Sequence, residues 1–192
     1  MQTLNAEEYI YPAASEVKEI LMDVIKDTPL SENRPLNMKG VECTQWNILN
    51  KNEYVQKLVE WIGEKIKEDF IPTPPEVKSS IDLRLAEIWS VTYGITADKK
   101  EDQSISIHNH TPSLFSFIYY VNVPEYSSPL LFPTSNVAVQ VLEGNCIIFE
   151  SRLDHAVPPN ESEGRVCISG NFVLGESIGT YGYDEELSQS FP

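Results

Sequence analysis

From about residue 82 onward, the chain is a series of short segments rich in β-branched and aromatic residues, separated by turn residues. No helical pattern lies between these segments, so no helix is available to carry a parallel crossover between neighbouring strands. The sequence therefore predicts a mainly β fold built from antiparallel sheets, a β-sandwich or jelly roll. The expected strands are 85–93, 104–110, 114–123, 136–142, 145–149 and 165–174.

Two amphipathic helices are expected before the strands. Apolar residues recur at helical spacing from Val17 to Ile25, with Ser15 placed to cap the helix, and again from Tyr54 to Ile66. The second helix should run over about 53–70, because the prolines that follow cannot continue it. Each helix has one apolar face, and we expect these faces to cover the outside of one sheet.

The length of 192 residues fits a single domain. We expect residues 1–80 to form a helical N-terminal part that packs on the sheet, 81–175 to form the jelly-roll core, and 176–192 to be an acidic tail.

The charge of the chain limits its partners. Lys and Arg number 14 and Asp and Glu 29, for a formal net charge of −15. Phosphate backbones and anionic lipid surfaces would repel such a chain, so nucleic acid and membrane are not expected partners. No apolar run approaches the roughly 20 residues that span a bilayer. Oligomeric state stays open.

The cysteines indicate a reducing compartment. Cys43, Cys146 and Cys167 are odd in number and lack the Cys-x-x-Cys spacing of a zinc knuckle. The first residues have neither the basic nor the apolar region of a signal peptide. We therefore expect a cytoplasmic protein, in the host cytoplasm if a phage encodes it.

The chain contains three histidines, and their placement is the most informative motif. His108 and His110 flank Asn109 near the end of an expected strand, where residues i and i+2 project from the same face. His155 comes from a distant segment. Two ligands from one strand end and a third from elsewhere can build an open metal site in a β-sandwich. A His-x-His pair alone is also common on exposed strands, so the interpretation as a metal site depends on the surrounding motifs.

Those motifs carry a family resemblance. The run His108-Asn109-His110-Thr111-Pro112, the strand Phe117-Ile118-Tyr119-Tyr120, and the segment around His155 followed by Arg165 resemble iron(II)/2-oxoglutarate-dependent oxygenases of the prolyl 4-hydroxylase-like branch. Within that superfamily the chain is most similar to small oxygenases that are frequent in bacteriophages. The resemblance covers about residues 85–174.

The resemblance implies a fold, an activity and a set of site residues. The fold would be a double-stranded β-helix, and the protein an Fe(II)- and 2-oxoglutarate-dependent dioxygenase that hydroxylates a C–H bond of a peptide or small molecule, with a prolyl residue as the natural guess. His108, His110 and His155 would hold the iron. Arg165 and Tyr120 would bind the far carboxylate of the co-substrate 2-oxoglutarate, a role that suits the planar fork of arginine.

The chain departs from the superfamily at one ligand. Most members have aspartate where His110 stands, which gives two histidines and one carboxylate. Asp154 and Asp102 are the nearby acids, and neither is well placed as a substitute. Trp89, Tyr93 and Tyr119 are candidates for lining the pocket, although core packing alone also explains them.

Two other functions are compatible with the same residues. Three histidines with an open fourth position can activate water on zinc, as in a hydrolase or hydratase. A metal-binding jelly roll without turnover, such as a phage structural or binding protein, is the other alternative. A cupin-type dioxygenase is a weaker one, since it would not use Tyr120 and Arg165.

Overall fold

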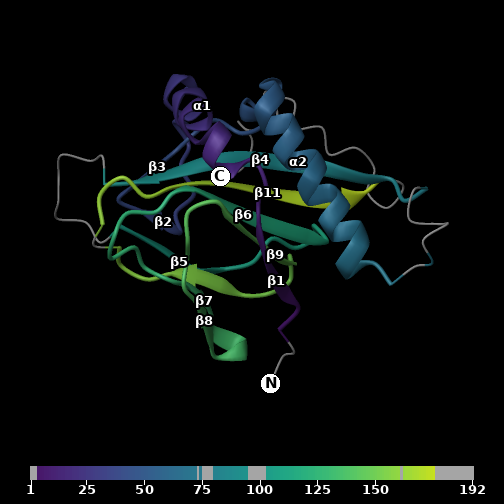
Figure 1. The fold of residues 1–192 in the computed structure, drawn as a ribbon. Coiled ribbons are helices and arrows are strands. Elements are labelled where there is room, and N and C mark those ends of the chain that lie inside the picture. The colour runs from purple at the N-terminus through teal and green to yellow at the C-terminus, as the bar shows by residue number, and fades with distance from the viewer. Residues whose placement is uncertain (1–3, 73, 75–79, 95–102, 161, 176–192) are drawn as a thin grey trace.

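Two antiparallel sheets pack face to face in the computed structural model, which describes residues 4–72, 74, 80–94, 103–160 and 162–175 (Figure 1). The larger sheet has the strand order β1-β9-β6-β11-β4-β3 and the smaller one β2-β5-β10-β7-β8. The strands of the larger sheet are β1 (Ala6–Ile10), β9 (Asn145–Glu150), β6 (Phe115–Asn122), β11 (Val166–Leu174), β4 (Leu83–Tyr93) and β3 (Val41–Cys43). The strands of the smaller sheet are β2 (Met38–Lys39), β5 (Ser104–His108), β10 (His155–Val157), β7 (Leu130–Phe132) and β8 (Val137–Val139). This is the predicted jelly roll.

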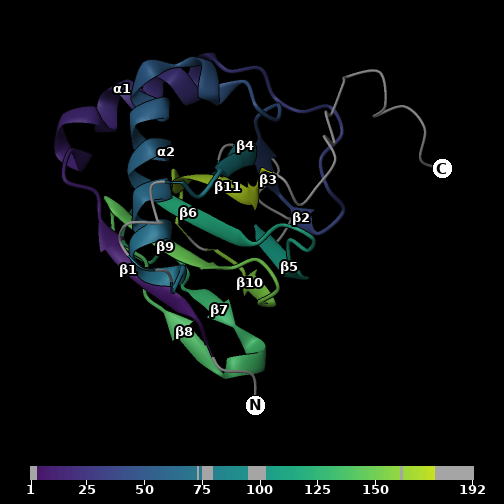
Figure 2. The same ribbon diagram turned by 90° about the vertical axis from the view of Figure 1, so that its right-hand side faces the viewer.

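Two helices cover the outer face of the larger sheet, as expected (Figure 2). They are α1 (Ala14–Asp27) and α2 (Glu53–Lys65), and α2 continues into a π-helical turn at Ile66–Phe70. The side chain of Asn52 caps α2 by accepting hydrogen bonds from the backbone N–H groups of the first turn. The expected cap of α1 is wrong, because Ser15 lies inside that helix and Ala13 precedes it without a side-chain cap. No helix among the described residues is long and apolar enough to cross a membrane.

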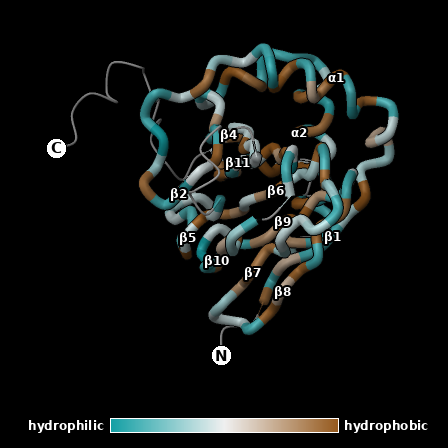
Figure 3. The backbone as a smooth tube through the Cα atoms, turned by 90° about the vertical axis from the view of Figure 1, so that its left-hand side faces the viewer, coloured by the Kyte–Doolittle hydropathy of each residue, from teal (hydrophilic) through white to brown (hydrophobic). Residues whose placement is uncertain are grey.

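Strand alternation divides the hydrophobic core into two layers. On β6, Phe117, Tyr119 and Val121 face the helices, while Ile118 and Tyr120 face the smaller sheet. The hydropathy colouring shows hydrophobic residues along the central strands and on the helices (Figure 3). Tyr119 packs against the ring of Tyr11 at 5.8 Å between centroids, on the helical side. The expectation that Tyr119 lines the pocket is therefore wrong, because its neighbour Tyr120 occupies the inward position.

The N-terminal part contributes more than helices. β1 pairs with β9, β3 pairs with β4, and β2 pairs with β5, so residues before position 80 extend both sheets. The sequence did not indicate these strands, nor β7 and β10, because segments of two to five residues are too short to show alternation. The predicted tail at 176–192 lies outside the described residues.

Candidate metal and co-substrate site

The sheet pairing brings two of the three histidines together. His108 is the last residue of β5 and His155 the first of β10, and the two are register partners in this antiparallel pair. His110 lies two residues beyond the end of β5 rather than on the strand, and its backbone N–H donates to the carbonyl of Ser151 at 2.8 Å. The expectation that the His-x-His pair shares one strand face is therefore wrong, although both rings still reach the same place.

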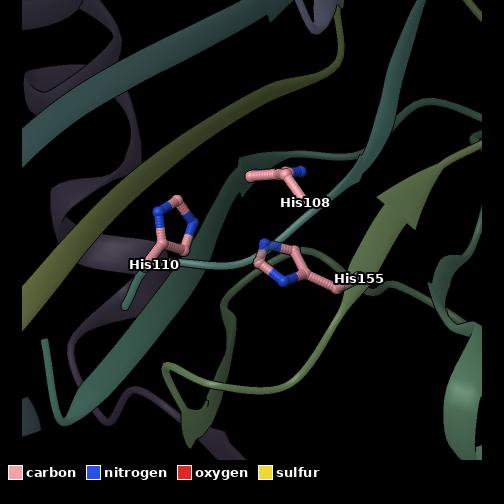
Figure 4. A group of neighbouring side chains, drawn as sticks. All are labelled: His108, His110 and His155. Carbon is pink, nitrogen blue, oxygen red and sulfur yellow. The ribbon is translucent and has the colours of Figure 1, made fainter. Parts of the chain in front are cut away.

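The three imidazoles surround one space (Figure 4). Their ring centroids are 4.3 Å apart for His108 and His155, 4.9 Å for His108 and His110, and 5.0 Å for His110 and His155. One nitrogen from each ring lies within 4.8 Å of the others. This spacing suits three ligands of a single metal ion.

Hydrogen bonds orient two of the rings for metal binding. Nδ1 of His108 lies 2.9 Å from the carbonyl oxygen of Ser106, and Nδ1 of His155 lies 2.9 Å from that of Leu153. A carbonyl oxygen only accepts, so in both rings Nδ1 carries the hydrogen and Nε2 keeps a free lone pair. Such outer hydrogen bonds are typical of histidines that bind metals.

Burial keeps the three rings in the neutral form that binds metal. Desolvation lowers the pKa of His108. It lowers the pKa of His110 to about 3, with a further contribution from repulsion by the other two rings. The pKa of His155 falls to about 4, again mainly through desolvation and then through repulsion by His108. The imidazoles are thus unprotonated at neutral pH.

No carboxylate joins the three histidines among the described residues. Asp154 accepts a hydrogen bond from Asn109 Nδ2 at 2.9 Å, which links the two segments that carry the histidines. Its carboxylate therefore has a structural partner, and Asp102, the other acid considered from the sequence, lies outside the described residues.

Arg165 lies in the wall of the same cavity as the histidines. It is 1% exposed, and its Nη1 donates to the carbonyl oxygen of Ser128 at 2.6 Å. Its Nε has no hydrogen-bond partner, and no ion pair to it is found among the described residues. A buried guanidinium without an anion is unfavourable, so this geometry indicates a site for an anionic ligand.

Two tyrosines flank the guanidinium. Its carbon lies 4.8 Å from the ring centroid of Tyr93 and 5.4 Å from that of Tyr120. Both hydroxyl groups are buried and lack a hydrogen-bond partner. Burial raises the pKa of both phenols, so they remain protonated and able to donate. Tyr93 and Arg165 line the cavity, whereas Tyr120 is not among its lining residues and contacts Arg165.

A close backbone approach places Arg165. Gly94 has a φ of +91°, and a Cβ atom there would lie 2.5 Å from the Cα of Glu163. The absence of a side chain lets the segment before β11 pack against the end of β4, where Gly164 N–H donates to Tyr93 O and Tyr93 N–H donates to Arg165 O. The guanidinium is thereby fixed beside Tyr93.

The histidines and the guanidinium share one cavity between the two sheets. The space open to the centre of a water-sized sphere within it is about 30 Å³. As expected from the sequence, Trp89 and Tyr93 line it. The contact of the Tyr93 ring with Arg165 was not predicted from the sequence. The alternation of β4 could have indicated it, because it places Tyr93 on the same face as Trp89. The full lining is Met38, Trp89, Val91, Tyr93, Ile105, His108, His110, Phe117, Ile118, Leu130, His155, Val157, Arg165, Cys167 and Ser169.

Comparison with known proteins identifies the fold. No protein-family model and no curated protein sequence matches the chain. Among solved structures, it is similar to a viral collagen prolyl hydroxylase from Paramecium Bursaria Chlorella virus-1, solved as a 2OG complex, with a TM-score of 0.64 and 15% identity over 87% of this chain and 94% of that one.

Two further enzymes show the same likeness. A Pseudomonas putida prolyl-4-hydroxylase has a TM-score of 0.64 and 16% identity over 89% of this chain and 93% of that one. A prolyl hydroxylase from Trichoplax adhaerens, in complex with a peptide fragment of the hypoxia inducible factor, has a TM-score of 0.59 and 13% identity over 87% of this chain and 83% of that one. The chain therefore has the fold of the prolyl hydroxylases and 2OG-Fe(II) oxygenases, which confirms the architecture implied by the sequence resemblance.

Proposed function

We propose that the protein is an Fe(II)- and 2-oxoglutarate-dependent dioxygenase that hydroxylates a C–H bond. The single observation that supports this most is the buried guanidinium of Arg165, which has no anionic partner among the described residues and shares a cavity with three converging histidines. One ligand that both binds a metal and carries a distant carboxylate would satisfy both ends of the cavity. 2-Oxoglutarate is such a ligand.

Separate residues would bind the metal and the co-substrate. His108, His110 and His155 would hold Fe(II) through Nε2 or the free ring nitrogen, leaving coordination positions for the 2-oxo acid end of the co-substrate. Arg165 would pair with the far carboxylate, and Tyr120 and Tyr93 would donate to it. When bound, iron would activate dioxygen, of which one atom would enter succinate as 2-oxoglutarate loses CO2 and the other would become the hydroxyl group of the substrate. The apolar remainder of the lining would limit the access of water to the metal.

The same cavity argues against a zinc hydrolase. Its lining contains no Asp or Glu, so apart from the metal ligands no residue there has the usual character of a general base. A hydrolase would also have no use for a buried guanidinium with two unsatisfied tyrosines beside it. A non-catalytic metal-binding module would also bury an unpaired guanidinium, which is unfavourable, and would have no anionic ligand for it.

A peptidyl residue is the substrate class that the structural neighbours favour. The Trichoplax enzyme was solved with a peptide, and the viral and Pseudomonas enzymes are described as prolyl hydroxylases. A prolyl side chain is accordingly the first substrate to test. The net charge of −15 favours neutral or cationic peptides over acidic ones.

The decisive experiment is anaerobic titration of the protein with Fe(II) and then with 2-oxoglutarate. Chelation should produce a visible metal-to-ligand charge-transfer band, and Arg165→Ala should weaken 2-oxoglutarate binding while leaving Fe(II) binding intact. Arg152→Ala is the matched control, because Arg152 is half exposed and pairs with Glu150. Tight zinc binding without a band would support the hydrolase, and no metal binding would support the structural module.

A further inference from the structure

Two loops that are far apart in sequence meet behind Arg165. The turn at 124–129 supplies the Ser128 carbonyl that accepts from Arg165 Nη1, and the segment 158–164 leads into β11. Three hydrogen bonds between their described residues join them. Asn160 Oδ1 accepts from the backbone N–H of Ser128 at 3.0 Å, Ser128 Oγ donates to the carbonyl of Pro159 at 2.7 Å, and the hydroxyl oxygens of Ser127 and Ser162 lie 3.0 Å apart. Asn160 therefore holds the N–H of the 127–128 peptide, and the carbonyl of the next peptide, 128–129, accepts from Arg165.

The side chain of Asn160 is buried and bonded at both ends. Its Nδ2 donates to the carbonyl of Ser162 at 2.7 Å, and its Oδ1 also accepts from Ser162 Oγ at 3.2 Å. Its backbone N–H donates to Gln103 O at 2.9 Å. Such a saturated amide has one orientation available, so the oxygen that accepts from the N–H of Ser128 has a defined position.

The position of Ser128 matters because its carbonyl oxygen occupies one edge of the guanidinium. With Nη1 committed to Ser128 O, the plane of the fork between Tyr93 and Tyr120 is set, and the remaining donors face a fixed direction. Without that acceptor the long arginine side chain has other rotamers available. Recognition of a carboxylate by a guanidinium depends on this alignment.

We propose that Asn160 is a positioning residue for Arg165, acting through the Ser128 carbonyl, and that it thereby sets the affinity and chain-length preference for the dicarboxylic co-substrate. The inference rests on the proposed function and extends it to a residue outside the cavity lining. Asn160 does not contact the co-substrate. It determines where the carboxylate end of the site lies relative to the metal end.

The test is the variant Asn160→Ala, studied as the full chain. Calorimetric titration of the Fe(II)-loaded protein under anaerobic conditions should show about tenfold weaker binding of 2-oxoglutarate, with Fe(II) affinity unchanged. The preference for 2-oxoglutarate over 2-oxoadipate, which is one methylene longer, should also decrease. A residue with only a structural role would lower the melting temperature without changing this preference.

Ser162→Ala is the matched control. It removes the hydroxyl bonds to Asn160 and Ser127 in the same loop but leaves the contact between Asn160 and Ser128 in place. Its 2-oxoglutarate affinity should stay at the wild-type value. Equal weakening in both variants would overturn the proposal, because general loop packing would then explain the effect, and so would an unchanged Asn160→Ala.

A second variant covers the case in which Asn160→Ala does not fold. Asn160→Asp keeps an oxygen acceptor for Ser128 N–H, so it should retain the wild-type preference for 2-oxoglutarate; a folded Asp variant that loses this preference would overturn the proposal. If the wild-type protein itself binds Fe(II) but no 2-oxoglutarate, the proposed function fails instead, and the two failures are distinguishable.

Discussion

The two ends of the cavity are built in different ways. At the metal end, His108 and His110 are partly exposed and sit at and just beyond a strand end, and each is fixed by backbone groups a few residues away in the chain or in the paired segment. At the carboxylate end, Arg165 and the two tyrosines are almost completely buried and come from three different strands or their immediate approaches. The three imidazoles at the metal end are neutral, so they need no bound ion to balance a charge. The carboxylate end holds a charge that needs a partner.

The largest expected effect is at the metal end. His155→Ala removes one of three ligands and should weaken Fe(II) binding by more than the roughly 100-fold that loss of an outer hydrogen bond can cost. Co-substrate binding should disappear with it. Equilibrium metal titration measures this, with circular dichroism as the check on folding. Retained Fe(II) affinity would show that the ligands lie elsewhere.

At the carboxylate end, Arg165→Met should separate the two halves of the site. The variant should bind 2-oxoglutarate about 100-fold more weakly, since two charge-assisted hydrogen bonds are lost, and should bind Fe(II) normally. Without ligands its melting temperature should equal or exceed that of the wild type, because an unpaired buried charge has been removed. A large drop in melting temperature would mean that Arg165 stabilises the fold, and would contradict an unpaired charge at the carboxylate end.

Smaller effects are expected from the two hydroxyl groups beside the guanidinium. Tyr120→Phe and Tyr93→Phe each remove one unsatisfied donor without changing the packing, so each should weaken 2-oxoglutarate binding by about fivefold. Melting temperatures without ligand should not fall. Calorimetry on both variants tests this, and an unchanged affinity in either would remove that tyrosine from the co-substrate site.

A further expected effect is a dependence of stability on pH that belongs to the metal end. The pKa of His155 is about 4 in the folded protein, below the usual 6.5 of an unfolded chain. As the pH falls from about 6.5 to 4, the unfolded chain gains a proton that the folded one does not, so the metal-free protein should lose stability in this window. Melting temperatures between pH 7 and 4.5 would show it. The slope should be shallower in His155→Gln, and a flat wild-type profile would contradict the assignment.

Much of the metal end could be predicted from the sequence, because its signal is local. The His108-Asn109-His110 motif is contiguous, and His155 stands in a recognisable segment. The position of His110 beyond the strand could not be read from the spacing, since it depends on where pairing with β10 stops. The hydrogen bond from Asn109 to Asp154 likewise joins distant segments.

The carboxylate end was only half predictable. Arg165 and Tyr120 were named through the family resemblance, but the contact of Ser128 with Arg165 and that of Asn160 with Ser128 join segments more than 30 residues apart. No periodicity or motif reports such contacts. The fold shows the same division: long strands and helices were indicated by their patterns, whereas β2, β7 and β10 exist only because neighbouring strands pair with them.

The pairing of β1 with β9 has a practical consequence for protein production. Residues 6–10 pair with β9 at one edge of the larger sheet. Phe149, on the inner face of β9, has its ring centroid 4.8 Å from that of His155. Trimming the first dozen residues, a natural choice when designing a shorter clone, would leave the backbone of β9 open to pairing with another molecule. Such a clone should therefore self-associate, which size-exclusion chromatography would show.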